Sequence, residues 1–290
     1  MLVDDLLLYA ALFGGWLIGR RFPARGPWPG RASLAAVVVL VGLLGASFHA
    51  IDGRQVLAVL PWAFVFAAAI LATTAGVYVA LERGSLPERA GDEPRPPLPR
   101  DRLPTSGLLL LALGGGYGVG RLTPLPTSSL IPIALAVLLL LVGYGLELSL
   151  RSVRRAWLPI ASAAIAVVAV AGVASLAAKL WANVVWATGL GFGWYSLTGP
   201  LVAARWGATV GLFAFLANFL REAMTMLLAP YAGRRLRGEG LAALGGATSM
   251  DTTLYFVVRY GDRRAGTLAV ASGLTLTVAA SLLVPLVLAL

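Results

Sequence analysis

The chain has no cysteine and a single histidine, His49, among its 290 residues. Without cysteine there is no disulfide framework, no thiolate metal site and no cysteine nucleophile, and one histidine lacks the partners of a zinc site. Charged residues are scarce as well, at 12% of the chain against about a quarter in soluble domains. This shortage of charge excludes an ordinary soluble globular domain.

Hydrophobic residues make up 59% of the chain, and the mean hydropathy is +0.84. These values predict an all-α integral membrane protein embedded in a lipid bilayer. The net charge of +10 does not indicate nucleic-acid binding, because the arginines cluster between apolar segments. Residues 1–21 begin with acidic residues and place their positive charge after the apolar stretch, so we expect a retained membrane helix and no cleaved signal peptide.

Ten apolar segments follow one another along the chain. Six have the composition of spanning helices, namely 6–19, 32–51, 56–81, 107–120, 130–146 and 158–178. The other four are 180–204, 207–230, 241–258 and 265–290. The first and third of these four are rich in Gly, Ser and Thr, which favours broken helices. Residues 82–104 are rich in Pro, Arg and acidic residues and predict an exposed, poorly ordered linker.

The chain also repeats part of its own sequence. Residues 14–20 recur as 115–121, and Val41-Gly42 recurs as Val142-Gly143, each at a spacing of 101. Because each copy holds three crossings, the second enters from the opposite side, which predicts inverted-topology repeats over 1–84 and 105–182. Residues 183–290 then form a transport core, in which 195–198 and 250–253 match weakly at a spacing of 55.

Both copies of the longer repeat contain a Gly-x-x-x-Gly spacing, at Gly15 and Gly19 and again at Gly116 and Gly120. This spacing is typical of faces on which two helices pack closely. It does not indicate a dinucleotide site, because no strand-turn-helix unit surrounds the glycines. We also consider a homodimer as an assembly.

Arginine placement orients the segments in the membrane. The loop 20–31 holds four arginines and the loop after Glu147 holds three, so both loops are expected in the cytoplasm. The N-terminus and C-terminus then lie outside. Later arginine clusters, at 234–237 and 259–264, face the cytoplasm only if 180–204 and 241–258 do not cross fully. We therefore expect eight transmembrane helices plus two re-entrant or discontinuous segments, with ten full crossings as the alternative.

Asp251 lies in a small, polar run, 245–253, whose surroundings are otherwise hydrocarbon. An ionisable group at membrane depth costs about 2.5–3.5 kcal/mol or more, so it usually faces a cavity where something charged binds or passes. Re-entrant backbone is tolerated only beside protein or water, so the glycine-rich stretches 189–199 and 245–253 are expected to meet near the midplane. Half-helix N-termini there suit a carboxylate. Asp251 suits an ammonium or a proton, and its structural alternative is a helix N-cap.

Other polar residues accompany Asp251. Arg221 and Glu222 lie well inside an apolar segment. They contact the substrate, or they form an ion pair with each other, or the arginine side chain extends to the membrane surface. Asp52 is either a second membrane acid or a solvated loop charge. The residues expected to bind substrate or protons are Asp251, Asp52, Glu222, Arg221, Asn218, Ser196, Thr198, Tyr195, Thr248, Ser249 and Thr252, with Glu147, near a helix end, less favoured. No metal or organic cofactor is expected, and the proton is the coupling ion.

The stretches 191–199 and 245–254, together with Asn218 and Arg221-Glu222, resemble the bacterial lysine exporter LysO family, most clearly over 189–290. The resemblance implies efflux of L-lysine and its toxic analogues, coupled to protons, with two membrane-embedded acids required. Asp251 matches one of these acids and Asp52 is matched to the other. One departure is Tyr255, which follows Leu254 where the family often has proline.

We therefore expect a secondary active exporter of L-lysine and cationic analogues in the bacterial inner membrane, working by proton antiport with alternating access. A proton and a cationic substrate that compete for one buried carboxylate produce such exchange. The alternative is a carrier of another small amino acid or organic anion, coupled to sodium, with Arg221 as its principal contact. An intramembrane hydrolase and a channel are less favoured, and the chain is not expected to be an enzyme.

Overall fold

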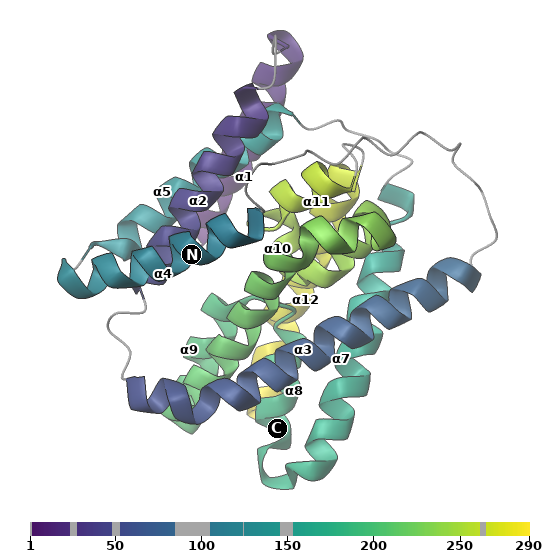
Figure 1. Cartoon of the computed structure of the whole chain (residues 1–290). Coiled ribbons are helices and arrows are strands. Elements are labelled where there is room, and N and C mark those ends of the chain that lie inside the picture. The colour runs from purple at the N-terminus through teal and green to yellow at the C-terminus, as the bar shows by residue number, and fades with distance from the viewer. Residues whose placement is uncertain are drawn as a thin grey trace. The chain divides into compact units, whose positions relative to one another are not determined.

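The computed structural model describes residues 2–23, 28–47, 53–84, 105–123, 125–145, 153–261 and 265–290. Every regular element within these ranges is a helix. In chain order the helices are α1 (Leu2–Arg21), α2 (Trp28–Ser47), α3 (Gly53–Gly84), α4 (Thr105–Leu122), α5 (Thr127–Tyr144), α7 (Trp157–Ala177), the short η2 (Lys179–Trp181), α8 (Ala182–Leu190), α9 (Tyr195–Trp206), α10 (Ala208–Gly245), the short η3 (Gly246–Met250), α11 (Leu254–Tyr260) and α12 (Ala265–Ala289) (Figure 1).

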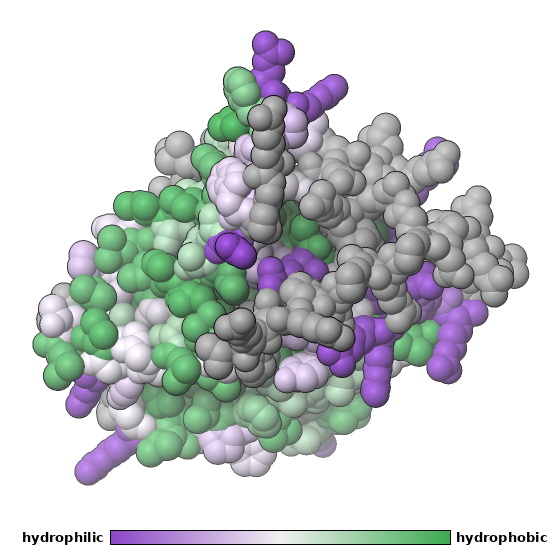
Figure 2. Space-filling view, turned by 45° about the horizontal axis from the view of Figure 1, so that its top comes forward, coloured by the Kyte–Doolittle hydropathy of each residue, from purple (hydrophilic) through white to green (hydrophobic). Residues whose placement is uncertain are grey.

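Each predicted apolar segment overlaps one of these helices or a pair of them, so the all-helical prediction is confirmed. Within the described ranges, α2, α3, α7, α12 and α10 continued through η3 are long and apolar enough to cross a membrane. Large apolar side chains such as Leu57, Trp62 and Leu111 are exposed on the helices. Apolar residues cover much of the surface visible in Figure 2. These features are those of a multi-pass membrane protein.

The helix predicted over 207–230 extends further than expected. Pro230 lies inside α10, and the chain leaves helical geometry only at Arg237, whose φ is 55° and ψ is −177°. The prediction that this helix ends at Pro230 is therefore wrong. A second helical stretch, 238–245, follows the kink at Arg237. Tyr255 does not remove the break after Asp251, because α11 begins at Leu254.

The chain forms two compact units. Unit 1 comprises Met1–Ile51 and Leu98–Leu148, which contain α1, α2, α4 and α5, and unit 2 comprises Asp52–Pro97 and Ser149–Leu290. The helices α3 and α7 thus belong with 183–290, which differs from the predicted division near residue 182. The reason is packing, because α3 lies against both α7 and α10, and Phe66 of α3 shares a buried cluster with Val167 and Leu216.

In unit 1, glycines bring α1 against α5 and α2 against α4. A Cβ on Gly15 would overlap the carbonyl oxygen of Leu140, and a Cβ on Gly116 would overlap that of Gly42. The second glycine of each Gly-x-x-x-Gly spacing makes the same kind of contact one turn later. Backbones approach this closely only where the side chain is a hydrogen atom. Both spacings are therefore packing faces within this chain.

The two helix pairs of unit 1 are packed in the same way. Matching contact residues of α1 and α4 have residue numbers that differ by 101, and those of α2 and α5 have residue numbers that differ by 98. The matched contacts are Gly15–Leu140 with Gly116–Gly42, Gly19–Tyr144 with Gly120–Ala46, and Leu12–Gly143 with Leu113–Gly45. Gly143 therefore corresponds to Gly45, so the predicted match of Val41-Gly42 with Val142-Gly143 at a spacing of 101 is wrong. The repeat in α1 and α4 keeps its spacing of 101, and the second copy has three residues fewer between its matched contacts.

We predict that Gly116→Ala destabilises the protein and that Gly118→Ala, on the same helix, does not. The new methyl group at 116 meets the Gly42 backbone, which must move, whereas a Cβ at 118 has nothing within 4 Å. Overpacking of this kind costs about 1–3 kcal/mol. Thermal unfolding of the two purified variants in detergent measures the difference. Equal melting temperatures would contradict the close packing of α2 and α4.

In unit 2, α10 is the common partner of the other helices. It contacts α3, α7, α8, α9, α11 and α12. One stretch of α10 carries four buried polar side chains, those of Asn218, Arg221, Glu222 and Thr225. Burying polar groups in an apolar core is unfavourable unless they find partners. Their partners identify the candidate site.

Candidate functional site

Two helices of unit 2 are interrupted, as predicted from their glycines. The first interruption separates α8 from α9 at residues 191–194, where Phe192 and Gly193 have φ values of 49° and 97°. The second separates the end of α10 from α11 at residues 246–253 and begins at Gly246, with φ 64°. Left-handed backbone is easily adopted by glycine, but Phe192 is a strained exception. We call these segments the first break and the second break.

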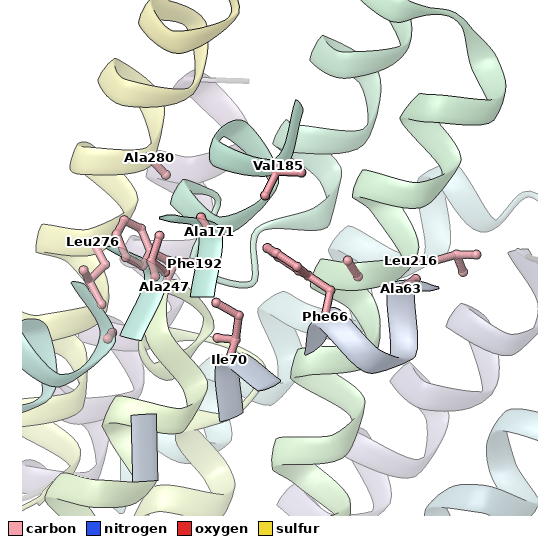
Figure 3. Packing of buried hydrophobic residues seen from close by; sticks show 13 residues of the cluster. Ala63, Phe66, Ile70, Ala171, Val185, Phe192, Leu216, Ala247, Leu276 and Ala280 are labelled. Atoms are coloured by element: carbon pink, nitrogen blue, oxygen red, sulfur yellow. The ribbon is translucent and has the colours of Figure 1, made fainter. Parts of the chain in front are cut away.

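The two breaks contact each other directly. The Ala247 N–H of the second break donates to the Phe192 carbonyl of the first, at 2.9 Å. Figure 3 shows Phe192 and Ala247 close to Leu276 of α12 in the buried cluster. Gly246 has no room for a side chain, because a Cβ there would overlap the Phe192 oxygen. The expected meeting of the two glycine-rich stretches is therefore observed.

The second break leaves four carbonyls of the helix 238–245 without intrahelical partners, as at any helix end. Two are satisfied within the break. The Gly246 N–H donates to the Ala242 carbonyl, and the Thr248 hydroxyl donates to the Gly245 carbonyl. The other two are satisfied by α10. Arg221 Nη2 donates to the Ala243 carbonyl at 3.3 Å. The Thr225 hydroxyl shares its one hydrogen between the Arg221 carbonyl of its own helix, at 2.8 Å, and the Leu244 carbonyl, at 3.3 Å.

Asn218 donates to a helix-end carbonyl at the first break, as Arg221 does at the second. Its amide nitrogen donates to the Thr188 carbonyl near the end of α8, at 3.0 Å, and its oxygen accepts from the Gly193 N–H at 2.8 Å. The same amide nitrogen also donates to the Thr198 hydroxyl, at 3.1 Å. The capped carbonyls, Thr188 and Ala243, are 55 residues apart, which is the spacing of the weaker sequence repeat. One face of α10 thus holds both breaks.

Glu222 lies beside this face and is 1% exposed. Neither of its carboxylate oxygens accepts a hydrogen bond of normal geometry from the described residues, although Thr252 lies beside it. Asp251, in the second break, lies close enough for the two carboxylates to repel each other. The Asp251 carboxylate accepts from the backbone N–H and the hydroxyl of Thr252. Two acids that repel each other suit a proton or a cation, either of which relieves the repulsion.

Tyr195 begins α9 on the same side as the two acids and interacts electrostatically with both. Its ring makes edge contacts with Phe215 and Phe219 of α10, at centroid distances of 5.2 and 5.7 Å. These aromatic contacts fix the tyrosine between α9 and α10. Tyr195, Glu222, Asp251 and Thr252 therefore form one group, which we call the acidic cluster.

The remaining predicted residues lie around this cluster in structural roles. Thr198 is buried and donates to the Trp194 carbonyl, while Ser196 is exposed and accepts from the Trp194 ring N–H. Ser249 donates to the Gly246 and Ala269 carbonyls, which fastens η3 to α12. Asp52, Glu147 and His49 lie outside the described residues.

The structural alternatives considered for Asp251 and Arg221 differ from what is observed. Thr253, not Asp251, precedes the first residue of α11, and the Asp251 carboxylate accepts from the Thr252 N–H. Arg221 and Glu222, although adjacent in the chain, form no ion pair, and Arg221 is only 3% exposed, so it does not snorkel. Thr225 is a further contributor that the sequence did not single out. Its position one turn after Arg221 on α10 is the signal that could have identified it.

A second polar group holds the start of the helix 238–245. Glu239 accepts from Arg155 at 3.1 Å and from the Tyr78 hydroxyl at 3.3 Å. Arg237, at the kink, forms an ion pair with Glu82 of α3 at 3.6 Å. These contacts fix the end of the helical stretch that lies far from the second break. Both ends of residues 238–245 are thus attached to neighbouring helices.

The chain combines apolar helices, two helix breaks in contact, and a buried acid, Glu222, near the half-buried Asp251. These features define a class, the helical membrane transporters, in which substrate sites are formed at discontinuous helices. Comparison with known proteins gives the family. Residues 108–288 match the family described as lysine exporter LysO, and the chain belongs to this family. It is a transporter family, not an enzyme family.

Two relatives are similar to the chain. The lysine exporter LysO of Escherichia coli strain K12 is 29% identical over 296 residues, covering 98% of this chain and 97% of the relative. A putative lysine exporter of Haemophilus influenzae is 32% identical over 84 residues, covering 29% of this chain and 43% of the relative. No solved structure matches the chain.

Proposed function

We propose that this protein exports L-lysine and cationic analogues across the bacterial inner membrane in exchange for protons. The observation that carries the proposal is the acidic cluster, in which buried Glu222 of α10 and Asp251 of the second break are close enough to repel each other. Membership of the lysine exporter family supports the choice of substrate. The two carboxylates supply the negative charge and the hydrogen-bond acceptors that an ammonium group needs.

The pairing of the acids supports exchange. Two negative charges next to each other in a medium of low dielectric repel strongly, so a proton or a cation must accompany them. A substrate ammonium that enters the cluster makes a proton unnecessary, and a proton that returns displaces the ammonium. The acidic cluster is thus occupied by either a proton or lysine and is exposed to one side of the membrane at a time. This cycle is proton antiport with alternating access.

Lysine also carries a carboxylate, which needs a positive partner. We propose that it lies toward the N-terminus of α9, because N-terminal N–H groups and the helix dipole attract anions. Tyr195 and Ser196 begin that helix. This arrangement leaves Asn218 and Arg221 to hold the breaks and assigns Asp251, Glu222, Tyr195 and Thr252 to the substrate and the proton.

We further propose eight crossings and two re-entrant segments, with both termini outside and with inverted repeats. The matched glycine contacts of α1, α2, α4 and α5 support the longer repeat. The caps on Thr188 and Ala243, 55 residues apart, support the shorter one. Since the chain has no cysteine, single introduced cysteines can report each loop's side through labelling by a membrane-impermeant reagent.

Uptake of labelled lysine into inverted vesicles with an acidic lumen tests the proposed function. We expect lysine to accumulate while the pH gradient lasts, to stop when a protonophore collapses it, and to need no sodium. Arginine and ornithine should compete, and a neutral amino acid should not. Vesicles without the protein are the control. Uptake that follows a sodium gradient, or that an organic anion inhibits best, would favour the alternative carrier.

A further inference from the structure

Arg221 is a buried cation without an anionic side chain beside it. It is 3% exposed, forms no ion pair among the described residues, and its Nε has no hydrogen-bond partner there. Its guanidinium instead lies against the backbone of the second break. Nη2 donates to the Ala243 carbonyl, and a Cβ placed on Gly246 would lie 2.8 Å from Nη2 and 3.1 Å from Cζ.

Among the described residues, one carbonyl accepts from this guanidinium, that of Ala243. The Phe192 carbonyl of the first break accepts instead from the Ala247 N–H, which joins the first break to the residue that follows Gly246. The Ala243 carbonyl belongs to the end of the helix 238–245. Helix C-termini carry about half a negative charge, and unwound backbone carbonyls with such helix ends are the groups that coordinate sodium in other broken-helix transporters.

We propose that the carbonyl end of the helix 238–245, next to the second break, is a cation site and that Arg221 fills it as a permanently attached cation. The consequence is that the protein needs no sodium ion to hold the breaks together, and that exchange of ions is left to the acidic cluster. The inference deepens the proposed function and rests on it where transport is concerned. It makes Arg221 a positioning residue for the breaks and not a contact for the substrate carboxylate.

Asn218 shows why a charge is needed at only one of the breaks. Its neutral amide caps Thr188, the carbonyl equivalent to Ala243 at a spacing of 55, and also accepts from the Gly193 N–H. The first break therefore offers a donor as well as acceptors to α10. At the second break the partner of Arg221 is the Ala243 carbonyl, which only a donor satisfies. A cation is the stronger donor there.

Thermal unfolding in detergent tests the site without any transport. We expect Arg221→Ala to melt several degrees below the wild-type protein, and millimolar guanidinium to restore at least half of the loss. Choline chloride at the same concentration controls for ionic strength, and the wild type should not respond to either salt. Arg221→Lys, which keeps a cation, should melt above Arg221→Met, which has a similar length but no charge.

Proteoliposomes made and assayed without sodium test the consequence for transport. Wild-type lysine exchange should be unchanged when sodium is added, and exchange by Arg221→Ala should be reduced about tenfold or more and partly recovered with guanidinium. Sodium-stimulated exchange by the wild type would overturn the inference, as would equal melting of the Lys and Met variants or a folded Ala variant that no cation stabilises. Absence of lysine exchange in the wild type would instead overturn the proposed function, and the melting data would still decide the site.

Discussion

Replacing Asp251 with asparagine is expected to abolish exchange of lysine for protons. The asparagine keeps the shape of the side chain and can still accept from Thr252, but it carries no negative charge and takes up no proton. Losing one partner of a desolvated charge pair costs about 3–5 kcal/mol, or about 10²–10⁴ in affinity. Lysine-dependent proton flux in proteoliposomes measures the loss.

The control for this variant is its melting temperature. The Thr253 hydroxyl donates to the Thr248 carbonyl, and Ser249 fastens η3 to α12, so the second break keeps these attachments when the charge of Asp251 is removed. We therefore expect Asp251→Asn to unfold within a few degrees of the wild type. Wild-type exchange by a stably folded Asp251→Asn protein would remove Asp251 from the mechanism.

Replacing Glu222 with glutamine is expected to have an equally large effect. Glu222 is the more deeply buried of the two acids, and its oxygens have no protein donor of normal geometry among the described residues. The glutamine amide replaces one carboxylate oxygen with an N–H donor. An ammonium group has only donors and cannot accept from it. We expect exchange to fall to background, measured as above.

Glu82→Gln is the matched control, because it also removes one carboxylate from unit 2. Glu82 is partly exposed and pairs with Arg237, and a pair of this kind contributes about 0–1 kcal/mol. Exchange by Glu82→Gln should therefore stay near the wild-type rate. Lysine binding by the Asp251→Asn, Glu222→Gln double variant should be no weaker than binding by either single variant, because residues that act as one unit are non-additive. Additive losses of lysine affinity would argue against a shared site.

Exchange for protons also solves the energetic problem of exporting a cation. Lysine has a net charge of about +1 at neutral pH, and moving that charge out against an inside-negative potential costs about 2.3 kcal/mol per 100 mV. One proton moving inward cancels this electrical cost, and two let the potential drive export. A pair of acids has the capacity for either ratio.

Much of the fold could be predicted from the sequence, because hydropathy and glycine content report local properties. All ten apolar segments overlap helices, and the two glycine-rich stretches are broken and meet as expected. The continuation of α10 through Pro230 was missed, because a proline's effect on a buried helix depends on its neighbours. The joining of α3 and α7 with 183–290 was missed for a similar reason, since it depends on tertiary packing.

The candidate site was predictable in its composition but not in its division of roles. The sequence groups Asn218, Arg221 and Glu222 on one stretch of α10, and it offers no means to see that the first two point their donors at backbone carbonyls. Backbone partners have no sequence signature, because every residue has a carbonyl. The assignment of Asp52 as the second acid remains a prediction, while Glu222 is the acid that the structure places beside Asp251.

The central claim is that lysine and protons occupy the same pair of acids in turn. It is tested most directly by binding, with purified protein in weakly buffered detergent, by measuring protons released and lysine bound in the same sample. We predict release of about one proton for each lysine bound, and none from the Asp251→Asn, Glu222→Gln double variant. Tight binding of lysine to the wild-type protein with no release of protons would contradict the account.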